Sequence, residues 1–168
     1  RKKKFGSNWQ KEAKSLARLQ RHIARKRLDW QHKISTELIK NYSGFVLENL
    51  NIKGMSKSAK GTIEIPGKSV KAKSGLNREI LSTAPSQFAL ILQYKCEWNG
   101  RYFNKVSPAY TSQTCCSCDY TSRDNRRSQS EFVCVNCGMA ENADVVGAKN
   151  ILGRDTSFNR ERGALARA

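Results

Sequence analysis

Residues 115–138 read CCSCDYTSRDNRRSQSEFVCVNCG, and this stretch decides how the rest of the chain is interpreted. It contains two Cys-x2-Cys pairs, Cys115 with Cys118 and Cys134 with Cys137, separated by fifteen residues. A two-residue gap lets both thiolates of one tight turn point to a common centre, and two such turns complete a tetrahedron of four sulfurs. The spacing predicts a zinc ribbon with four cysteine ligands that spans residues 109–140.

Other chemistry for these cysteines fits the spacing less well. Iron–sulfur proteins of the ferredoxin type place three cysteines close together, whereas these cysteines form two separate pairs. A disulfide framework belongs to secreted proteins, and the N-terminus of this chain shows no signal peptide. We expect Cys116 to be a free thiol and Cys96 to be a small core residue at a helix end.

The charge of the chain requires a polyanionic partner. Its 31 Lys and Arg against 14 Asp and Glu give a net charge of +17, and 13 of these basic residues lie within residues 1–40. A membrane-surface helix would need a broader apolar face, so nucleic acid is the expected partner. Between the cysteine pairs, residues 123–127 (RDNRR) form a polar tip that we expect to lie outside any core. This tip either contacts phosphate or is only solvated. The candidate nucleic-acid-binding residues are Arg18, Arg21, Arg25, Arg27, Arg123, Arg126 and Arg127.

The N-terminal segment, residues 1–41, is predicted to be a long basic helix. Residues 8–41 contain neither Pro nor Gly, and Trp9, Leu16, Ile23 and Trp30 recur at intervals of seven. We expect this narrow stripe to pack along one seam while the cations face outward, with a break near Asp29 left open.

The middle of the chain predicts a mixed α/β domain. Residues 42–52 indicate a buried strand that ends at Glu48, and residues 53–75 indicate a loop around a possible short strand at 62–65. A helix is expected from Pro85 to about Trp98, followed by a strand over 101–107. No apolar run is long enough for a membrane span, so we expect a soluble, cytoplasmic protein.

Two acidic residues lie on apolar segments of this basic chain. Glu48 ends the predicted strand, and Asp144 begins a helix on which Ala148 and Ile151 share its face. Each has a structural explanation: Glu48 as a partner of Lys or Arg, and Asp144 as a complement to the helix dipole. Together they instead favour phosphodiester chemistry, in which Mg²⁺ or Mn²⁺ bridges carboxylates and phosphate oxygens.

The chain resembles the C-terminal half of the transposon-encoded OrfB/TnpB proteins. The motifs that carry the resemblance are residues 46–55 (VLENLNIKGM), 107–115 (SPAYTSQTC), 132–134 (FVC), 137–138 (CG), 142–144 (NAD) and 148–152 (AKNIL), together with Cys118. Asp119 departs from the pattern, because the family usually has glycine after the first cysteine pair.

The resemblance implies an incomplete RuvC-like, RNase H-type nuclease fold with an inserted zinc ribbon. It also implies an RNA-guided DNA endonuclease related to compact type V CRISPR effectors, with guide RNA and DNA as partners. Three carboxylates bind two Mg²⁺ ions in that family. Carried over by position, the resemblance implies that Glu48 would be the second of them and Asp144 the third. On this view residues 42–108 are a RuvC-like core portion, 141–156 a RuvC-like C-terminal helix and 157–168 a tail.

The first catalytic acid of the family has no counterpart here. The only acids before Glu48 are Glu12, Asp29 and Glu37, all within the predicted helix, and the chain begins at Arg1. We therefore expect a truncated gene product or fragment that is inactive alone. The alternative is a non-catalytic zinc-ribbon nucleic-acid-binding protein or a transposase remnant.

Overall fold

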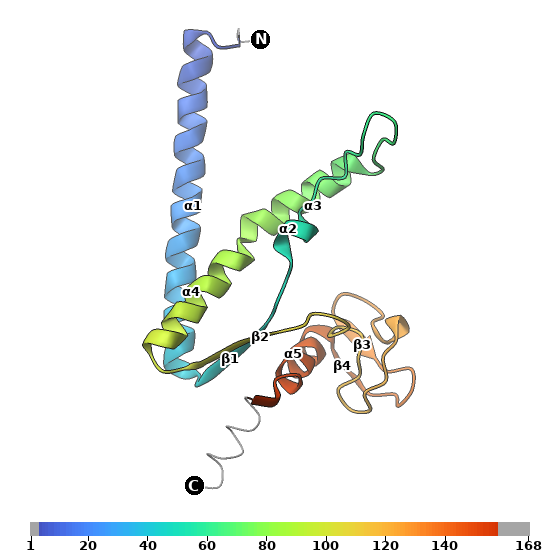
Figure 1. Ribbon diagram of the computed structural model, residues 1–168. Helices are drawn as coiled ribbons and strands as arrows, with labels where there is room; N and C mark the ends of the chain where they lie inside the picture. Colours follow the sequence, from blue (N-terminus) through green and yellow to red (C-terminus); the bar gives the residue numbers. More distant parts are fainter. Residues whose placement is uncertain (1–3, 158–168) are drawn as a thin grey trace.

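The computed structural model describes residues 4–157, which form a mixed α/β structure as predicted (Figure 1). Its elements are α1 (Ser7–Asn41), β1 (Gly44–Glu48), α2 (Ile52–Met55), α3 (Val70–Thr83), α4 (Pro85–Trp98), β2 (Tyr102–Val106), η1 (Arg123–Asn125), β3 (Glu131–Val133), β4 (Ala140–Asn142) and α5 (Ala143–Gly153). Residues 158–168, which hold most of the predicted tail, lie outside the described range. None of the helices among residues 4–157 combines the length and the apolar composition that a bilayer crossing requires.

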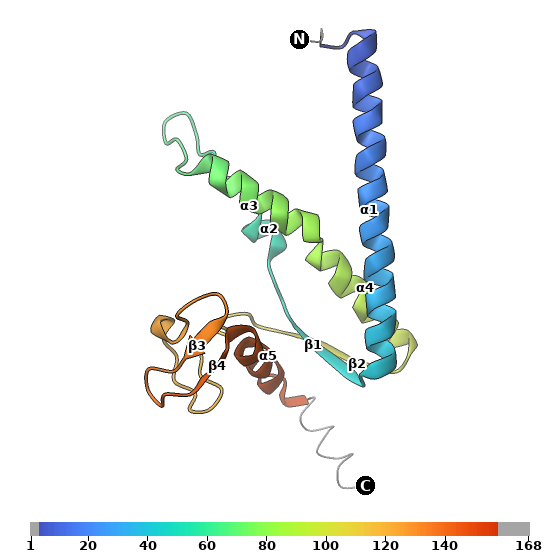
Figure 2. The ribbon, with the colours of Figure 1, turned by 180° about the vertical axis from the view of Figure 1, so that it is seen from behind.

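Helix α1 runs unbroken through Asp29 and extends away from the rest of the molecule (Figures 1 and 2). Only its last turns are packed: Gln31, Ser35 and Ile39 are buried where α1 crosses α4. The expectation that the whole apolar stripe packs along one seam is wrong for its first two thirds. Its residues are 36% (Trp9) to 58% (Trp30) exposed, because no other element of residues 4–157 lies beside that part of α1.

Strands β1 and β2 form a parallel pair, with Gly44 opposite Tyr102 and Glu48 opposite Val106. The connection between them contains α2, α3 and α4. On one face of the pair, Phe45, Leu47 and Phe103 pack against a core made by Ile39, Leu92 and Cys96. Cys96 is fully buried, as predicted.

Helix α5 lies against the other face of the pair, where it contacts β1, and its Ile151 lines the same groove as Val46 and Glu48. Side chains of successive strand residues point to opposite faces, so Val46 and Glu48 point away from Phe45 and Leu47. Just beyond α5, the carboxylate of Asp155 accepts hydrogen bonds from the Tyr102 hydroxyl at 2.9 Å and from the Asn104 amide at 3.1 Å. The pair therefore lies between α1 and α4 on one side and α5 on the other.

The second half of the connection between the strands agrees with the prediction, but the predicted loop at residues 53–75 is wrong at its two ends, where α2 and the start of α3 are helical. Pro85 occupies the first turn of α4 as expected. The short strand at residues 62–65 is wrong: only an isolated bridge joins Gly61 to Pro66, closing a turn. Helix α3 was not predicted, because its sequence is rich in Lys, Ser and Gly and none of its residues is buried.

One edge of β1 has no neighbouring strand among residues 4–157. Toward β2, the Ser43 carbonyl accepts from Tyr102 N–H, and Asn49 N–H donates to the Val106 carbonyl. Since backbone groups of successive residues alternate between edges, those of Gly44 and Val46 face the open edge. Most sheets have about four to six strands, so this pair of two strands is small.

Candidate metal centre and carboxylate groove

The two cysteine pairs form equivalent turns within residues 109–140, which are called here the four-cysteine module. In the first turn Cys115 N–H donates to Tyr120 O at 2.9 Å, and Asp119 N–H donates to Cys115 O at 3.0 Å. In the second turn the equivalent bonds run from Cys134 N–H to Met139 O at 2.8 Å and from Gly138 N–H to Cys134 O at 2.9 Å. The local sequence repeats, so the backbone geometry repeats.

The four predicted ligands come together. The Sγ atoms of Cys115, Cys118, Cys134 and Cys137 all lie within 4.8 Å of one another, and Cys116 is not in the group. The Cys115–Cys137 and Cys118–Cys134 sulfur pairs are 3.7 and 3.6 Å apart. A tetrahedron with Zn–S bonds of about 2.3 Å places its sulfurs about 3.8 Å apart, so the donors fit a Zn²⁺ ion.

Hydrogen bonds favour the metal-binding form of one of these thiols. The backbone N–H of Tyr120 and the side-chain amide of Asn136 lower the pKa of Cys118 to about 6, because both donate to the thiolate. Thiolates, not thiols, are the ligands of zinc.

The core of the module continues into α5. Phe132 on β3 is fully buried together with Cys115 and Cys134, and Ala143 and Val146 of α5 complete this cluster. Strands β3 and β4 pair antiparallel beneath it. The module is thus attached to α5 through apolar contacts.

The expectation that the tip between the cysteine pairs lies outside any core is wrong at Asn125. Its side chain is fully buried and donates to Gln113 O and Tyr120 O, while its oxygen accepts from Val135 N–H at 3.0 Å. An Asn can satisfy several backbone groups at once, which explains a buried polar residue in this otherwise exposed segment.

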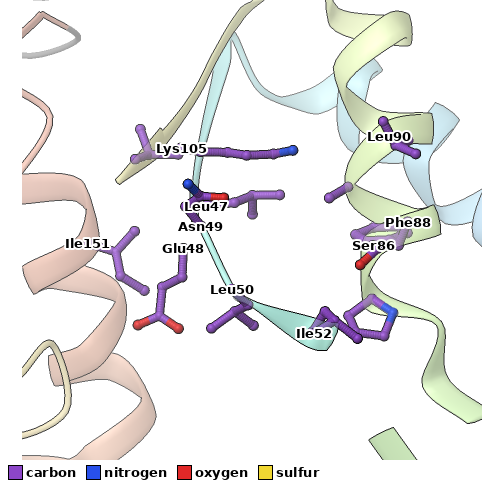
Figure 3. A pocket seen from close by; sticks show the side chains of 13 residues that line it. Leu47, Glu48, Asn49, Leu50, Ile52, Ser86, Phe88, Leu90, Lys105 and Ile151 are labelled. Carbon is purple, nitrogen blue, oxygen red and sulfur yellow. The ribbon is translucent and has the colours of Figure 1, made fainter. Parts of the chain in front are cut away.

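Glu48 lies at the end of β1 and points toward α5, as Figure 3 shows. It is half-buried, and its Oε1 accepts a hydrogen bond from the Thr111 hydroxyl at 2.5 Å. A groove of about 510 Å³ runs past it between α4 and α5. The groove is lined by residues from both faces of β1, including Val46 and Leu47, and by Phe88 of α4 and Ile151 of α5.

Asp144 occupies the first turn of α5, where Asn142 caps the helix by accepting from the N–H groups of Asp144 and Val145. Its side chain is 83% exposed and lies 3.9 Å from the guanidinium of Arg126. Glu48 and Asp144 are both on the α5 side of β1, but Glu48 contacts Thr111 whereas Asp144 contacts Arg126. The structure does not join them in one hydrogen-bond network among the described residues.

The predicted arginines divide into two kinds. Arg18, Arg21 and Arg25 are exposed along the projecting part of α1, and Arg27 is half-buried. In the module Arg123 and Arg127 are placed at the tip between the cysteine pairs, whereas Arg126 donates to the carbonyls of Ser128 and Gln129 and so helps to close its own turn.

Residues that the sequence did not single out connect these features. Thr111 is buried, and its carbonyl accepts from the Asn150 side chain, which also bonds to Thr114 O. Both Thr111 and Asn150 belong to motifs quoted for the resemblance, so their positions were marked although their roles were not. Asp155 follows α5 with no motif around it, and no sequence signal pointed to its burial.

Comparison with known proteins places these features in a family. Residues 1–59 match the family model described as "Probable transposase" (OrfB_IS605), and residues 86–151 match the "Cas12f1-like, TNB domain" model. The chain is 49% identical over 152 residues to the Escherichia coli K12 protein named "Putative RNA-guided DNA endonuclease InsQ", and the match covers 90% of this chain and 38% of that protein.

Two solved structures share the fold. The match to the protein of a Cas12f1-sgRNA-target DNA complex covers 81% of this chain and 35% of that protein chain, at 23% identity and a TM-score of 0.51. The match to CasPhi-2 (Cas12j) bound to crRNA and phosphorothioate-DNA covers 90% of this chain and 23% of that protein chain, at 20% identity and a TM-score of 0.53. These two likenesses concern the fold alone. The sequence matches show that the chain belongs to the OrfB/TnpB family of transposon-encoded proteins and carries a Cas12f1-like TNB domain.

Proposed function

We propose that this chain is the C-terminal part of an RNA-guided DNA endonuclease and that it supplies two of the three carboxylates of a RuvC-like site. The observation that carries this proposal is the position of Glu48, at the end of a strand and in a groove that faces α5. Asp144 on α5 is the second contributor. The chain spans about two fifths of the length of its E. coli relative.

Glu48 and Asp144 would hold Mg²⁺ or Mn²⁺, which activates the attacking water and stabilises the leaving oxygen in this chemistry. The residues suit such an ion: Glu48 is half-buried with one oxygen held by Thr111, and Asp144 has an exposed carboxylate. Hard divalent ions prefer oxygen ligands of this kind. A third carboxylate is required to clamp two ions.

The open edge of β1 gives the place from which the third carboxylate would come. Backbone groups of Gly44 and Val46 face this edge, and the groove beside it is lined mainly by apolar side chains. A further strand paired there would extend the sheet and bring its side chains next to Glu48. The isolated chain, without that strand, is therefore proposed not to cleave DNA.

Zn²⁺ in the four-cysteine module is proposed to be structural. The module has four sulfur donors, so no coordination position remains open for a substrate, as in closed zinc sites. Its apolar core is shared with α5, so the ion would also fix the helix that carries Asp144.

Plasmid nicking by the purified 168-residue chain with Mg²⁺ tests the inactivity. We expect no nicking above a buffer control. Mg²⁺-dependent nicking that disappears in Glu48→Ala, but persists in the matched Glu79→Ala variant on α3, would contradict it.

A second candidate is a non-catalytic nucleic-acid-binding module, and the exposure of Asp144 beside Arg126 favours it. In that case Glu48 and Asp144 do not bind divalent ions. DNA binding that weakens with salt but is unchanged by Mg²⁺, Glu48→Ala and Asp144→Ala supports this candidate; Mg²⁺-dependent binding that the two alanines remove supports the first.

A further inference from the structure

The Thr111 hydroxyl stands between the strand that carries Glu48 and the first cysteine pair. It lies 2.5 Å from Glu48 Oε1 and 3.1 Å from the carbonyl of Pro108. A hydroxyl has one hydrogen, and an ionised carboxylate is the stronger acceptor. Because the carboxylate is also nearer, we assign the hydrogen bond to Glu48.

The backbone of the same residue is tied to α5. The Asn150 side-chain amide donates to Thr111 O at 2.8 Å and to Thr114 O at 2.7 Å, and Thr114 immediately precedes Cys115. Thr111 is only 4% exposed, so water does not compete freely for these bonds. A continuous chain of contacts therefore runs from Glu48 through residues 111–114 to the first metal ligand.

We propose that Thr111 is a positioning residue that couples the orientation of the Glu48 carboxylate to Zn²⁺ binding in the four-cysteine module. The catalytic meaning of that orientation rests on the proposed function, but the coupling itself does not. Zn²⁺ fixes the turn at Cys115, the turn fixes residues 111–114, and Thr111 holds Glu48. By linkage, loss of the Thr111–Glu48 bond must weaken Zn²⁺ binding to the same extent that Zn²⁺ strengthens the bond.

The chain offers a matched control in the same segment. Thr114 is closer to Cys115 than Thr111 is, and its hydroxyl bonds to Tyr110 O and to the Thr121 hydroxyl, not to Glu48. If loss of any threonine hydroxyl merely disturbs the segment, Thr114→Val should weaken Zn²⁺ affinity as much as Thr111→Val does. Only the effect of Thr111→Val on Zn²⁺ affinity should depend on whether Glu48 is present.

Zn²⁺ affinity of the full 168-residue chain, measured by competition with a chromophoric chelator, provides the first test. We expect Thr111→Val and Glu48→Ala each to weaken affinity by roughly tenfold, which is about 1.4 kcal/mol, and the double variant to be no weaker than either. Thr111→Ser should restore the affinity, and Glu48→Gln should be intermediate. Additive effects of Thr111→Val and Glu48→Ala, or equal coupling of Thr114→Val to Glu48→Ala, would overturn the proposal.

Carbon-13 NMR of the Glu48 side-chain carboxyl provides the reciprocal test, with the signal assigned by its loss in Glu48→Ala. Adding Zn²⁺ to the metal-free chain should shift this signal in the wild type and in Thr111→Ser, and leave it unmoved in Thr111→Val. A shift of equal size in Thr111→Val contradicts the coupling. Neither readout requires DNA cleavage, so a failure here is distinct from a failure of the nuclease proposal.

Discussion

Asp119 and Gly138 occupy the same position after the two cysteine pairs, and both have a left-handed backbone, with φ of 58° and 75°. Each donates its N–H to the carbonyl of the first cysteine of its pair. Glycine adopts this conformation at no steric cost, whereas Asp does so less readily. The departure from the family pattern at Asp119 is thus a strained residue in an otherwise repeated turn.

We expect Asp119→Gly to stabilise the zinc-bound module by about 0.5–1 kcal/mol, because it relieves the left-handed strain. Gly138→Ala is the converse control and should destabilise by about 1–2 kcal/mol. A Cβ at Gly138 meets no atom within 4 Å, so its cost comes from the backbone alone. Denaturant unfolding, followed by a signal from the module, measures the change in the free energy of unfolding in both variants. A loss of stability in Asp119→Gly contradicts this account.

Zinc removal should unfold the module and loosen the start of α5, because Ala143 and Val146 pack in the cysteine cluster. The second core, around Ile39, Leu92 and Cys96, is separate and should persist. Hydrogen exchange before and after chelation measures this difference. Unchanged protection across residues 110–146 after complete zinc removal is incompatible with a structural metal.

Tyr102→Phe should destabilise the fold by about 1.5–3 kcal/mol, because Asp155 is a buried carboxylate that loses a hydroxyl donor. The pKa of Tyr102 is raised, first by burial and then by Asp155. Its contribution is therefore fully present below the ordinary tyrosine pKa of about 10 and is lost as pH rises through the raised value. Wild-type stability should fall in that alkaline range more steeply than that of Tyr102→Phe, as urea titrations at several pH values can measure.

Replacing Arg18, Arg21 and Arg25 together by Gln should weaken duplex DNA binding. It should also reduce the salt dependence of binding by about 0.9 in log–log slope for each phosphate that the protein no longer neutralises. The matched control removes the same charge from the loop before α3, at Lys57, Lys60 and Lys68. If both triple variants change the slope equally, α1 is not the specific binding surface.

Local chemistry made the cysteine cluster, the first turn of α4 and the end of β1 predictable. Metal-ligand spacing, Pro85 and the apolar run before Glu48 each act over a few residues. The burial of Asn125 was not predictable in this way, because its partners Gln113 and Val135 are set by the folded module. Helix α1 shows the opposite case: its periodicity correctly predicted a helix, but a pattern cannot say whether a partner lies beside it.

Glu48 is a candidate because of its place after an apolar run, but its contact with Thr111 depends on how residues 107–114 continue from β2 to the edge of β1. Similarly, the shared face of Asp144 and Ile151 follows from helical spacing. Whether Asp144 approaches Glu48 depends on how α5 packs against β1, which sequence spacing does not describe.

The central claim is tested most directly in a chimera, in which the residues of the E. coli relative that match this chain are replaced by the chain itself. With its guide RNA and Mg²⁺, the chimera is expected to cleave target DNA, and Glu48→Ala or Asp144→Ala is expected to abolish cleavage while Glu79→Ala leaves it intact. Guided cleavage that survives Glu48→Ala or Asp144→Ala at the unsubstituted rate would contradict the assignment of these carboxylates to the nuclease site.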